Sequence, residues 1–120
     1  MSKKRVVYYF DEKGKNPVWE FITFLPTHER DKCFEYIEYL ARKGENVRRP
    51  VGDYISQKLY ELRPKQTRII YFFFLKNYAV IVHAFRKKTD DIPKSDIKLA
   101  VNRMDEFIVR HQKGSIRLWG

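Results

Sequence analysis

The sequence contains little cysteine and no long hydrophobic run. Cys33 is the single cysteine, so the chain cannot close an internal disulfide, and one thiol cannot form a thiolate zinc site by itself. Its apolar neighbours Phe34, Ile37 and Leu40 predict a buried core thiol rather than a nucleophile. No apolar run approaches the ~20 residues that span a membrane, and the run at 6–10 is too short for a signal peptide. We therefore expect a cytoplasmic protein without a membrane partner.

Repeats, linkers, low-complexity segments and convincing clusters of metal ligands are also missing. We expect one domain over residues 1–120, with a core at about 5–110, a tail at 115–120, and neither metal nor cofactor. Hydrophobic residues make up 43% and aromatic residues 16% of the chain, which argues against a disordered protein.

Positive charge is the main feature that the sequence does have. It contains 25 Lys and Arg residues against 15 Asp and Glu residues, which gives a formal charge of +10. Such a charge favours a polyanionic partner: RNA, DNA, an anionic membrane or an acidic protein. The alternative is a solubility surface, although the charge exceeds the magnitude of ~2–8 common for small domains.

Local patterns predict an α+β fold with the element order β-α-α-β-β-β-α. Asn16 before Pro17 suits the start of one helix, Thr27 can cap a second helix, and Gly44 suits its end. The strands are expected at 6–10, 58–63, 69–75 and 78–85, the helices at 17–25, 28–43 and 93–113, and a loop at 45–57.

The last three strands follow one another through short turns, which is typical of a small antiparallel sheet. The two N-terminal helices must cover one face of this sheet. The other face then stays open to hold a site. We expect Trp19 and the aromatic residues at 69–75 to belong to the core rather than to a platform for stacking bases.

The two-residue turn at 76–77 suits a hairpin. It predicts three cross-strand pairs, namely Leu75 with Tyr78, Ile70 with His83, and Arg68 with Phe85. Because side chains alternate between the faces of a strand, one face is expected to carry Arg68, Ile70, Phe72, His83, Phe85 and Lys87. The other face is expected to carry Ile69, Tyr71, Phe73, Val80, Val82 and Arg86.

The strand at 58–63 has two possible registers. A four-residue turn at 64–67 places Arg63 opposite Arg68 and puts Glu61 on the face of Arg68, whereas a three-residue turn puts both on the other face. Two arginines directly opposite each other destabilise a sheet that stands alone. They make sense around a phosphate, which guanidinium groups bind in a bidentate way.

One carboxylate, one imidazole and several permanent cations would then share a face, and this set suits phosphodiester cleavage. A base removes the proton of a ribose 2′-hydroxyl, which attacks the neighbouring phosphorus, and an acid protonates the leaving 5′-oxygen. Arginines stabilise the charge that grows on the phosphate oxygens. This reaction requires no metal.

Four segments carry a family resemblance: KLYELR at 58–63, RIIYF at 68–72, HAFRKKT at 83–89, and IP at 92–93 before a basic helix. Their order and spacing resemble the RelE/HigB superfamily of toxins, and most of all its phage-related, HigB-type branch. The resemblance covers about residues 5–110. It implies a small antiparallel sheet packed on N-terminal helices, and it favours the register that puts Glu61 and Arg68 on one face.

The resemblance implies the toxin of a type II toxin–antitoxin pair, an mRNA endoribonuclease that inhibits translation and in many members cuts message in the ribosomal A site. The partners implied are mRNA, the ribosome and a cognate antitoxin, often a small helix-turn-helix DNA-binding protein. The catalytic residues implied are Glu61 as base, His83 as acid, Arg68 and Lys87. Contacts to RNA phosphates are expected from Arg63, Arg86, Lys88, Lys58 and Lys65. The tail offers His111 and Trp119 where many members use a C-terminal tyrosine or histidine.

Simpler interpretations stay open for the same residues. Glu61 can form a surface ion pair with Arg63 or Arg68, and His83 can be satisfied by hydrogen bonds within the sheet. The whole basic face can bind nucleic acid without cutting it. The chain can also be a degenerate toxin that only holds an antitoxin or a phage partner.

Overall fold

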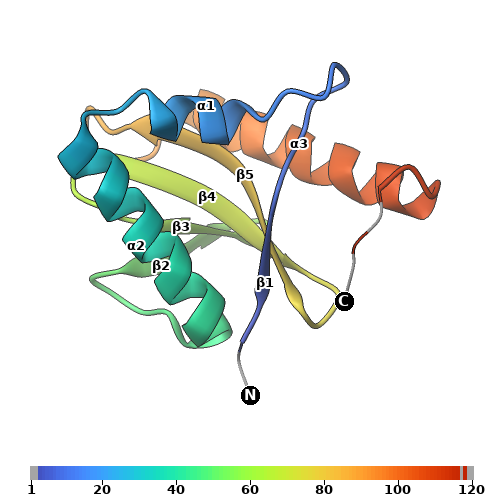
Figure 1. Cartoon of the computed structure of the whole chain (residues 1–120), viewed down its shortest axis with the longest axis horizontal. Helices are drawn as coiled ribbons and strands as arrows, with labels where there is room; N and C mark the ends of the chain where they lie inside the picture. The colour runs from blue at the N-terminus through green and yellow to red at the C-terminus, as the bar shows by residue number, and fades with distance from the viewer. Residues whose placement is uncertain (1–2, 117, 119–120) are drawn as a thin grey trace.

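The computed structural model describes residues 3–116 and 118, and it is built from one mixed sheet and three α-helices (Figure 1). The elements in chain order are β1 (Arg5–Tyr8), α1 (Pro17–Thr23), α2 (Thr27–Lys43), a short 3-10 helix (Gly44–Asn46), β2 (Gly52–Ser56), β3 (Leu59–Leu62), β4 (Thr67–Phe74), β5 (Tyr78–Arg86) and α3 (Lys94–Gln112). This order confirms the predicted α+β class. In the described part of the chain, no helix combines the length and the apolar character needed to cross a bilayer.

The sheet has the strand order β1-β5-β4-β3-β2, and it differs from the prediction in two ways. The pair of β1 with β5 is parallel, so the sheet is mostly rather than wholly antiparallel. The segment 45–57, expected as a loop, contains the edge strand β2, which pairs with β3. Gly52 permits this pairing, because a Cβ atom there would lie 2.7 Å from the carbonyl oxygen of Glu61.

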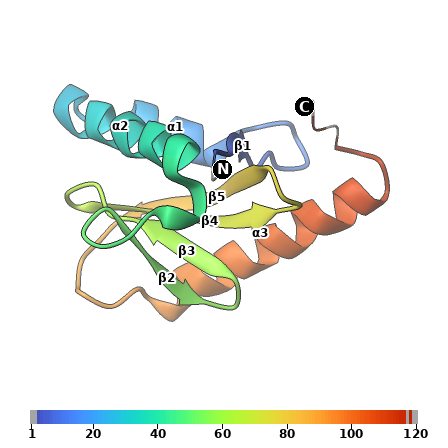
Figure 2. The same cartoon turned by 90° about the horizontal axis from the view of Figure 1, so that it is seen from below.

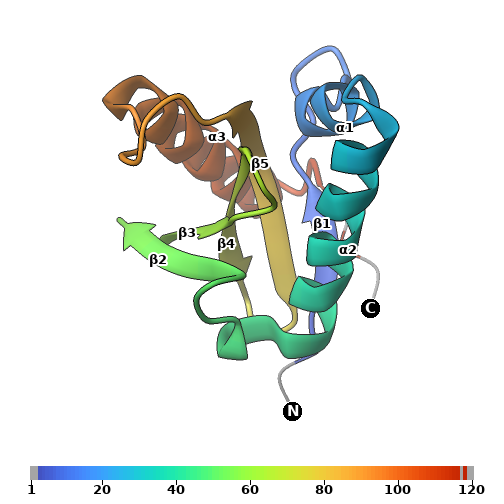
Figure 3. The same cartoon turned by 90° about the vertical axis from the view of Figure 1, so that its left-hand side faces the viewer.

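Helices cover both faces of the sheet, as Figures 2 and 3 show. One core lies under α1 and α2 and contains Cys33, Ile37 and Tyr71, and burial raises the pKa of the Cys33 thiol to about 11. A second core lies under α3 and contains Met104 and Phe107. The face expected to be open is therefore partly covered by the apolar stripe of α3.

The helix ends follow the local sequence with one exception. The Asn16 side chain accepts a hydrogen bond of 3.0 Å from the Trp19 backbone N–H, which confirms the predicted cap. Thr27 is not a cap, because α2 already begins there and Pro26 occupies the position before it. Gly44 ends α2 with a φ of 52°, a conformation that glycine adopts without strain.

Trp19 is less buried than expected. Its ring packs against Tyr8 and Phe34, with centroid distances of 6.0 and 5.3 Å, yet the residue remains 47% exposed. The short helix α1 lies along the edge of the molecule, so one side of the indole faces solvent. Tyr71 is 1% exposed and belongs to the core, as predicted.

The register of β4 and β5 contains two departures from the prediction that compensate each other. The turn has three residues rather than two, so Phe74 rather than Leu75 pairs with Tyr78. An irregularity between Ile70 and Tyr71 then restores the predicted pairs of Ile70 with His83 and of Arg68 with Phe85.

The same irregularity changes the faces of two valines. Val80 and Val82 lie in the core under α3, whereas they were expected on the face of Ile69 and Tyr71. Val80 is opposite Phe72, so these two side chains share a face. The extra residue in β5 is therefore what keeps His83 on the face of Arg68.

Candidate active site

The strand β3 has the register expected from a four-residue turn at 64–67. Of the two registers considered, this is the one that puts Glu61 on the face of Arg68. Glu61 pairs with Ile70, and Ile70 pairs with His83, so three neighbouring strands place these residues in one row. The next row on the same face contains Arg68 opposite Phe85. Glu61 and His83 are two strands apart, which separates their Cα atoms by about 10 Å.

Glu61 lies between two guanidinium groups. Its Oε2 accepts a hydrogen bond of 2.6 Å from Arg63 Nη1, and its Oε1 is 3.8 Å from Arg68 Nε. Glu61 is 5% and Arg68 6% exposed, whereas the Arg63 side chain is 21% exposed. Among the residues that the structure describes, no hydrogen-bond donor reaches Glu61 Oε1. The cluster therefore contains a buried acceptor with unused capacity.

The turn between β3 and β4 fixes Arg68 in this position. The Thr67 backbone N–H donates a 2.9 Å hydrogen bond to the carbonyl oxygen of Pro64 and closes the turn. Arg68 Nη1 donates to the carbonyl oxygens of Lys65 and Thr67, both at 2.8 Å. Burial and then the nearby Arg63 lower the pKa of the Arg68 guanidinium. Arg68 is thus a held, poorly solvated cation that an anion would stabilise.

His83 belongs to a second cluster on the same face. Its Nε2 lies 2.7 Å from Asp96 Oδ1, and its ring stacks on Phe85 at a centroid distance of 5.4 Å. Burial lowers the pKa of His83, while the hydrogen bond to Asp96 opposes this shift. Burial is thus the larger influence on the pKa of His83, and the contact with Asp96 is the smaller one.

Asp96 is a site residue that the sequence analysis did not find. It lies in the first turn of α3, directly after Pro93, and it reaches the sheet because α3 crosses this face. The sequence did contain one signal, an acidic residue at the start of a helix, but this pattern is common for reasons of the helix dipole alone.

Asp53 and Arg49 extend the charged row to the edge of the sheet, and they were missed because β2 was expected to be a loop. Asp53 pairs with Glu61 across β2 and β3. Arg49 Nε lies 2.8 Å from Asp53 Oδ2, and this hydrogen bond lowers the pKa of Asp53. Both side chains are partly exposed.

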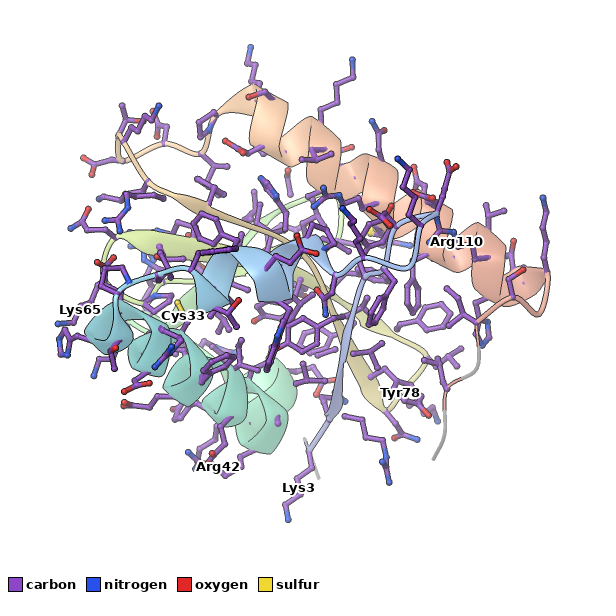
Figure 4. The ribbon with its side chains drawn as sticks, turned by 45° about the horizontal axis from the view of Figure 1, so that its top comes forward. Lys3, Cys33, Arg42, Lys65, Tyr78 and Arg110 are labelled. Atoms are coloured by element: carbon purple, nitrogen blue, oxygen red, sulfur yellow. The ribbon has the colours of Figure 1, made fainter. Side chains whose placement is uncertain are left out.

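The remaining predicted RNA contacts are spread over the surface. Arg86 Nη2 bonds Glu29 of α2 at 2.6 Å. Lys87, which was predicted as a catalytic residue, has its Nζ 3.2 Å from Asp90. Exposed positions are occupied by Lys88 after β5, Lys58 in the turn between β2 and β3, and Lys65. Figure 4 shows Lys65 at the rim of the molecule, where its ammonium group contacts His28.

The last two candidates are in the C-terminal segment. The His111 ring, in the last turn of α3, packs edge-on against Phe74 at a centroid distance of 4.9 Å. Phe74 is at the opposite end of β4 from Arg68. Trp119 lies outside the described residues. In the described part of the chain, no group of three or more His, Cys, Asp and Glu side chains is placed to hold a metal ion.

Comparison with known families adds the matching model "Phage derived protein Gp49-like (DUF891)", which covers residues 20–105. This match spans more than half of the chain. The chain belongs to the phage-derived Gp49-like family. The matched part of this Gp49-like protein includes Glu61, Arg63, Arg68, His83 and Asp96. No curated protein matches the sequence.

Proposed function

We propose that this Gp49-like protein is the toxin of a type II toxin–antitoxin pair and acts as an mRNA endoribonuclease. Its target is message on the ribosome, and the result is inhibition of translation. Support comes from the resemblance to RelE/HigB toxins, from the net charge of +10, and from the geometry of the Glu61 cluster. The ribosome supplies further phosphate groups that this charge attracts.

The observation that carries the proposal is the buried Oε1 atom of Glu61, which no hydrogen-bond donor reaches in the described part of the chain. Leaving a buried acceptor without a donor costs about 1–3 kcal/mol, and more for a charged group. A ribose 2′-hydroxyl would supply the missing donor and would pass its proton to the carboxylate. The same contact would place the neighbouring phosphate beside Arg68, which already lies 3.8 Å from this oxygen.

Arg63 controls the approach to this oxygen. It is the more exposed of the two arginines and bonds Glu61 at 2.6 Å, whereas Arg68 is held by backbone carbonyls. An incoming phosphate competes with the carboxylate for Arg63, because guanidinium groups bind phosphate in a bidentate way. When Arg63 turns toward the phosphate, Glu61 becomes accessible as a base.

The reaction then follows from the groups present. Glu61 takes the 2′-hydroxyl proton, the 2′-oxygen bonds to phosphorus, and the bond from phosphorus to the 5′-oxygen breaks. The products are a 2′,3′-cyclic phosphate and a 5′-hydroxyl, whose proton comes from His83. RNA phosphates beside the ring raise the pKa of His83, and so offset the effect of its burial. Arg63 and Arg68 stabilise the negative charge on the phosphate.

Expression of the wild type and of Arg68→Ala tests this function. The wild type is expected to arrest growth and to cut message on programmed ribosomes, and Arg68→Ala is expected to lose about 10²–10³-fold in cleavage rate. Arg42→Ala removes the same charge from the exposed face of α2 and serves as the matched control. In the described part of the chain, the Arg42 guanidinium interacts with Glu38 and with the ring of Tyr39.

Each rival function predicts a different result. A protein that only binds nucleic acid would shift RNA mobility in a strongly salt-dependent way and leave RNA length unchanged. A degenerate toxin would do neither and would still co-purify with the product of a neighbouring gene. An active toxin with an antitoxin would lose its effect on growth when the neighbouring gene is expressed with it.

A further inference from the structure

A cavity of about 440 Å³ lies beside the His83 cluster, at the end of β5. Its lining includes Phe21 of α1, Phe85, Arg86 and Lys88 at the end of β5, and Ser95 and Asp96 of α3. The volume falls within the roughly 300–1,000 Å³ of small-molecule sites. Nothing in the proposed reaction uses this cavity.

The sheet topology creates the cavity. β1 pairs with β5 from Tyr78 to Ile81, and among the described residues no strand pairs with this edge of β5 beyond that point. The helices α1 and α3 come close to this uncovered edge from opposite faces of the sheet, as Figure 3 shows. The cavity lies between them and opens to solvent at Lys88 and Ser95, which are both exposed.

Two contacts connect the cavity to the candidate active site. Phe85, in its lining, stacks on the His83 ring at 5.4 Å, and Asp96, also in its lining, lies 2.7 Å from His83 Nε2. A strand of RNA that crossed β3, β4 and β5 from Glu61 past His83 would therefore continue toward the cavity.

We propose that this cavity binds a nucleobase of the RNA strand, downstream of the phosphate that is cut. The assignment of the bound strand as substrate rests on the proposed function, whereas the binding of a base does not. Phe21 and Phe85 offer aromatic surfaces on which a base can stack. Ser95 and Asp96 offer a hydroxyl and a carboxylate oxygen for the N–H groups on the edge of the base.

The lining favours a base over a phosphate alone. The Asp96 carboxylate repels an anion inside the cavity, and Arg86 already bonds Glu29. Lys88 lies at the mouth, where it suits the phosphate attached to a bound nucleotide rather than an ion within the cavity.

Titration of the ¹⁵N-labelled full chain with nucleoside 5′-monophosphates tests the proposal. The backbone amides of Phe85, Lys88 and Ser95 are expected to shift in a saturable way. Ribose 5-phosphate and inorganic phosphate are expected to bind at least about tenfold more weakly, since they lack the stacking base. Equal shifts with inorganic phosphate, or no shift of these amides with any of the four nucleotides, would overturn the proposal.

Two exposed serines supply a matched pair of variants. Ser95→Leu fills the cavity from its rim without adding an aromatic ring, and it is expected to weaken nucleotide binding about tenfold or more. Ser115→Leu lies outside the cavity and is expected to bind as the wild type does. Unchanged binding by Ser95→Leu would contradict the assignment. If the protein binds nucleotides in the cavity but does not cut RNA, the proposed reaction is rejected and the proposed base site stands. If it cuts RNA but does not bind nucleotides there, the base site is rejected and the reaction stands.

Discussion

Two glutamates of this protein lie beside arginines, but they differ in burial and in the donors that reach their oxygens. The Glu106 side chain is 34% exposed, and the Glu61 side chain is 7% exposed. Glu106 of α3 accepts a hydrogen bond of 2.6 Å from the Tyr9 hydroxyl on Oε1, and its Oε2 bonds Arg110. Both oxygens of Glu106 therefore have a donor. Glu61 also has arginine neighbours, yet only its Oε2 has a donor among the described residues.

The surroundings of Tyr9 complete the first of these clusters. The guanidinium groups of Arg103 and Arg110 lie over the Tyr9 ring, at 5.2 and 5.5 Å from its centroid, and Arg103 also bonds the carbonyl oxygen of Val82. Every member thus contributes to holding α3 on the sheet. A satisfied polar cluster stabilises a fold, whereas an unsatisfied buried acceptor retains capacity for a ligand. The Glu106 cluster therefore stabilises the fold, whereas Glu61 keeps one oxygen that a ligand could use, as the proposed function requires.

The largest effect is expected from exchanging each glutamate for glutamine. Glu61→Gln keeps the size of the side chain but removes the base, so cleavage is expected to fall about 10²–10⁴-fold. Glu106→Gln is expected to cleave at the wild-type rate and to lose about 1 kcal/mol of unfolding free energy, because its hydrogen bonds lose their ionic character. Cleavage assays on programmed ribosomes and urea unfolding measure the two effects. Full cleavage by Glu61→Gln would remove the base from the mechanism.

A smaller effect is expected from Tyr9→Phe. The change deletes the hydroxyl that satisfies Glu106 Oε1, and the partly exposed carboxylate can recover water, so we expect a loss of about 1 kcal/mol. Tyr39→Phe is the control, since the Tyr39 hydroxyl has no hydrogen bond within the described part of the chain. Thermal unfolding of both variants measures the difference. An equal melting temperature for Tyr9→Phe and the wild type would show that the Glu106 cluster is not stabilising.

The parts of this comparison that the sequence could reveal are those that depend on strand alternation. The spacing of Arg68 and His83 predicted a common face, and the structure confirms it. For Glu61 the spacing left two registers open, and the structure has the one that the family resemblance favoured. The predicted pair of Ile70 with His83 is correct because two errors of the prediction cancel. The turn has one residue more than expected, and β5 contains one extra residue. Turn length and irregularities depend on backbone geometry that residue patterns do not specify.

The missed residues come from contacts between distant segments. Asp96 reaches His83 only because α3 packs across the sheet. The helical pattern predicted the apolar stripe of α3, but it did not predict the surface on which this stripe packs. Asp53 is on an edge strand of five residues that begins at Gly52 and follows Pro50, and both of these residues are typical of loops. The sequence therefore predicted which strand residues lie side by side, but it did not predict the contacts of Asp96 and Asp53 with their neighbours.

The smallest expected effect concerns pH and the role of Asp96. Because burial lowers the pKa of His83 below its unfolded value of about 6.5, the unfolded chain binds this proton more readily. The contribution of His83 to the free energy of unfolding is therefore fully present above about pH 6.5. It is lost as the pH falls below that value, by at most about 1.4 kcal/mol per pH unit. Only Asp96 and Arg103 act on His83 with their charges, in opposite directions, among the described residues.

Asp96→Asn removes the carboxylate that raises the pKa of His83, so this pKa is expected to fall further and the decline of stability with acid to steepen. Titration of the His83 ring by NMR measures the shift, and Asp90→Asn, which contacts Lys87 instead, is the control. A further lowered pKa would also slow cleavage by reducing the supply of protons at the 5′-oxygen. If the pKa of His83 rises or stays constant in Asp96→Asn, Asp96 does not position a proton donor, and the two clusters on this face act independently.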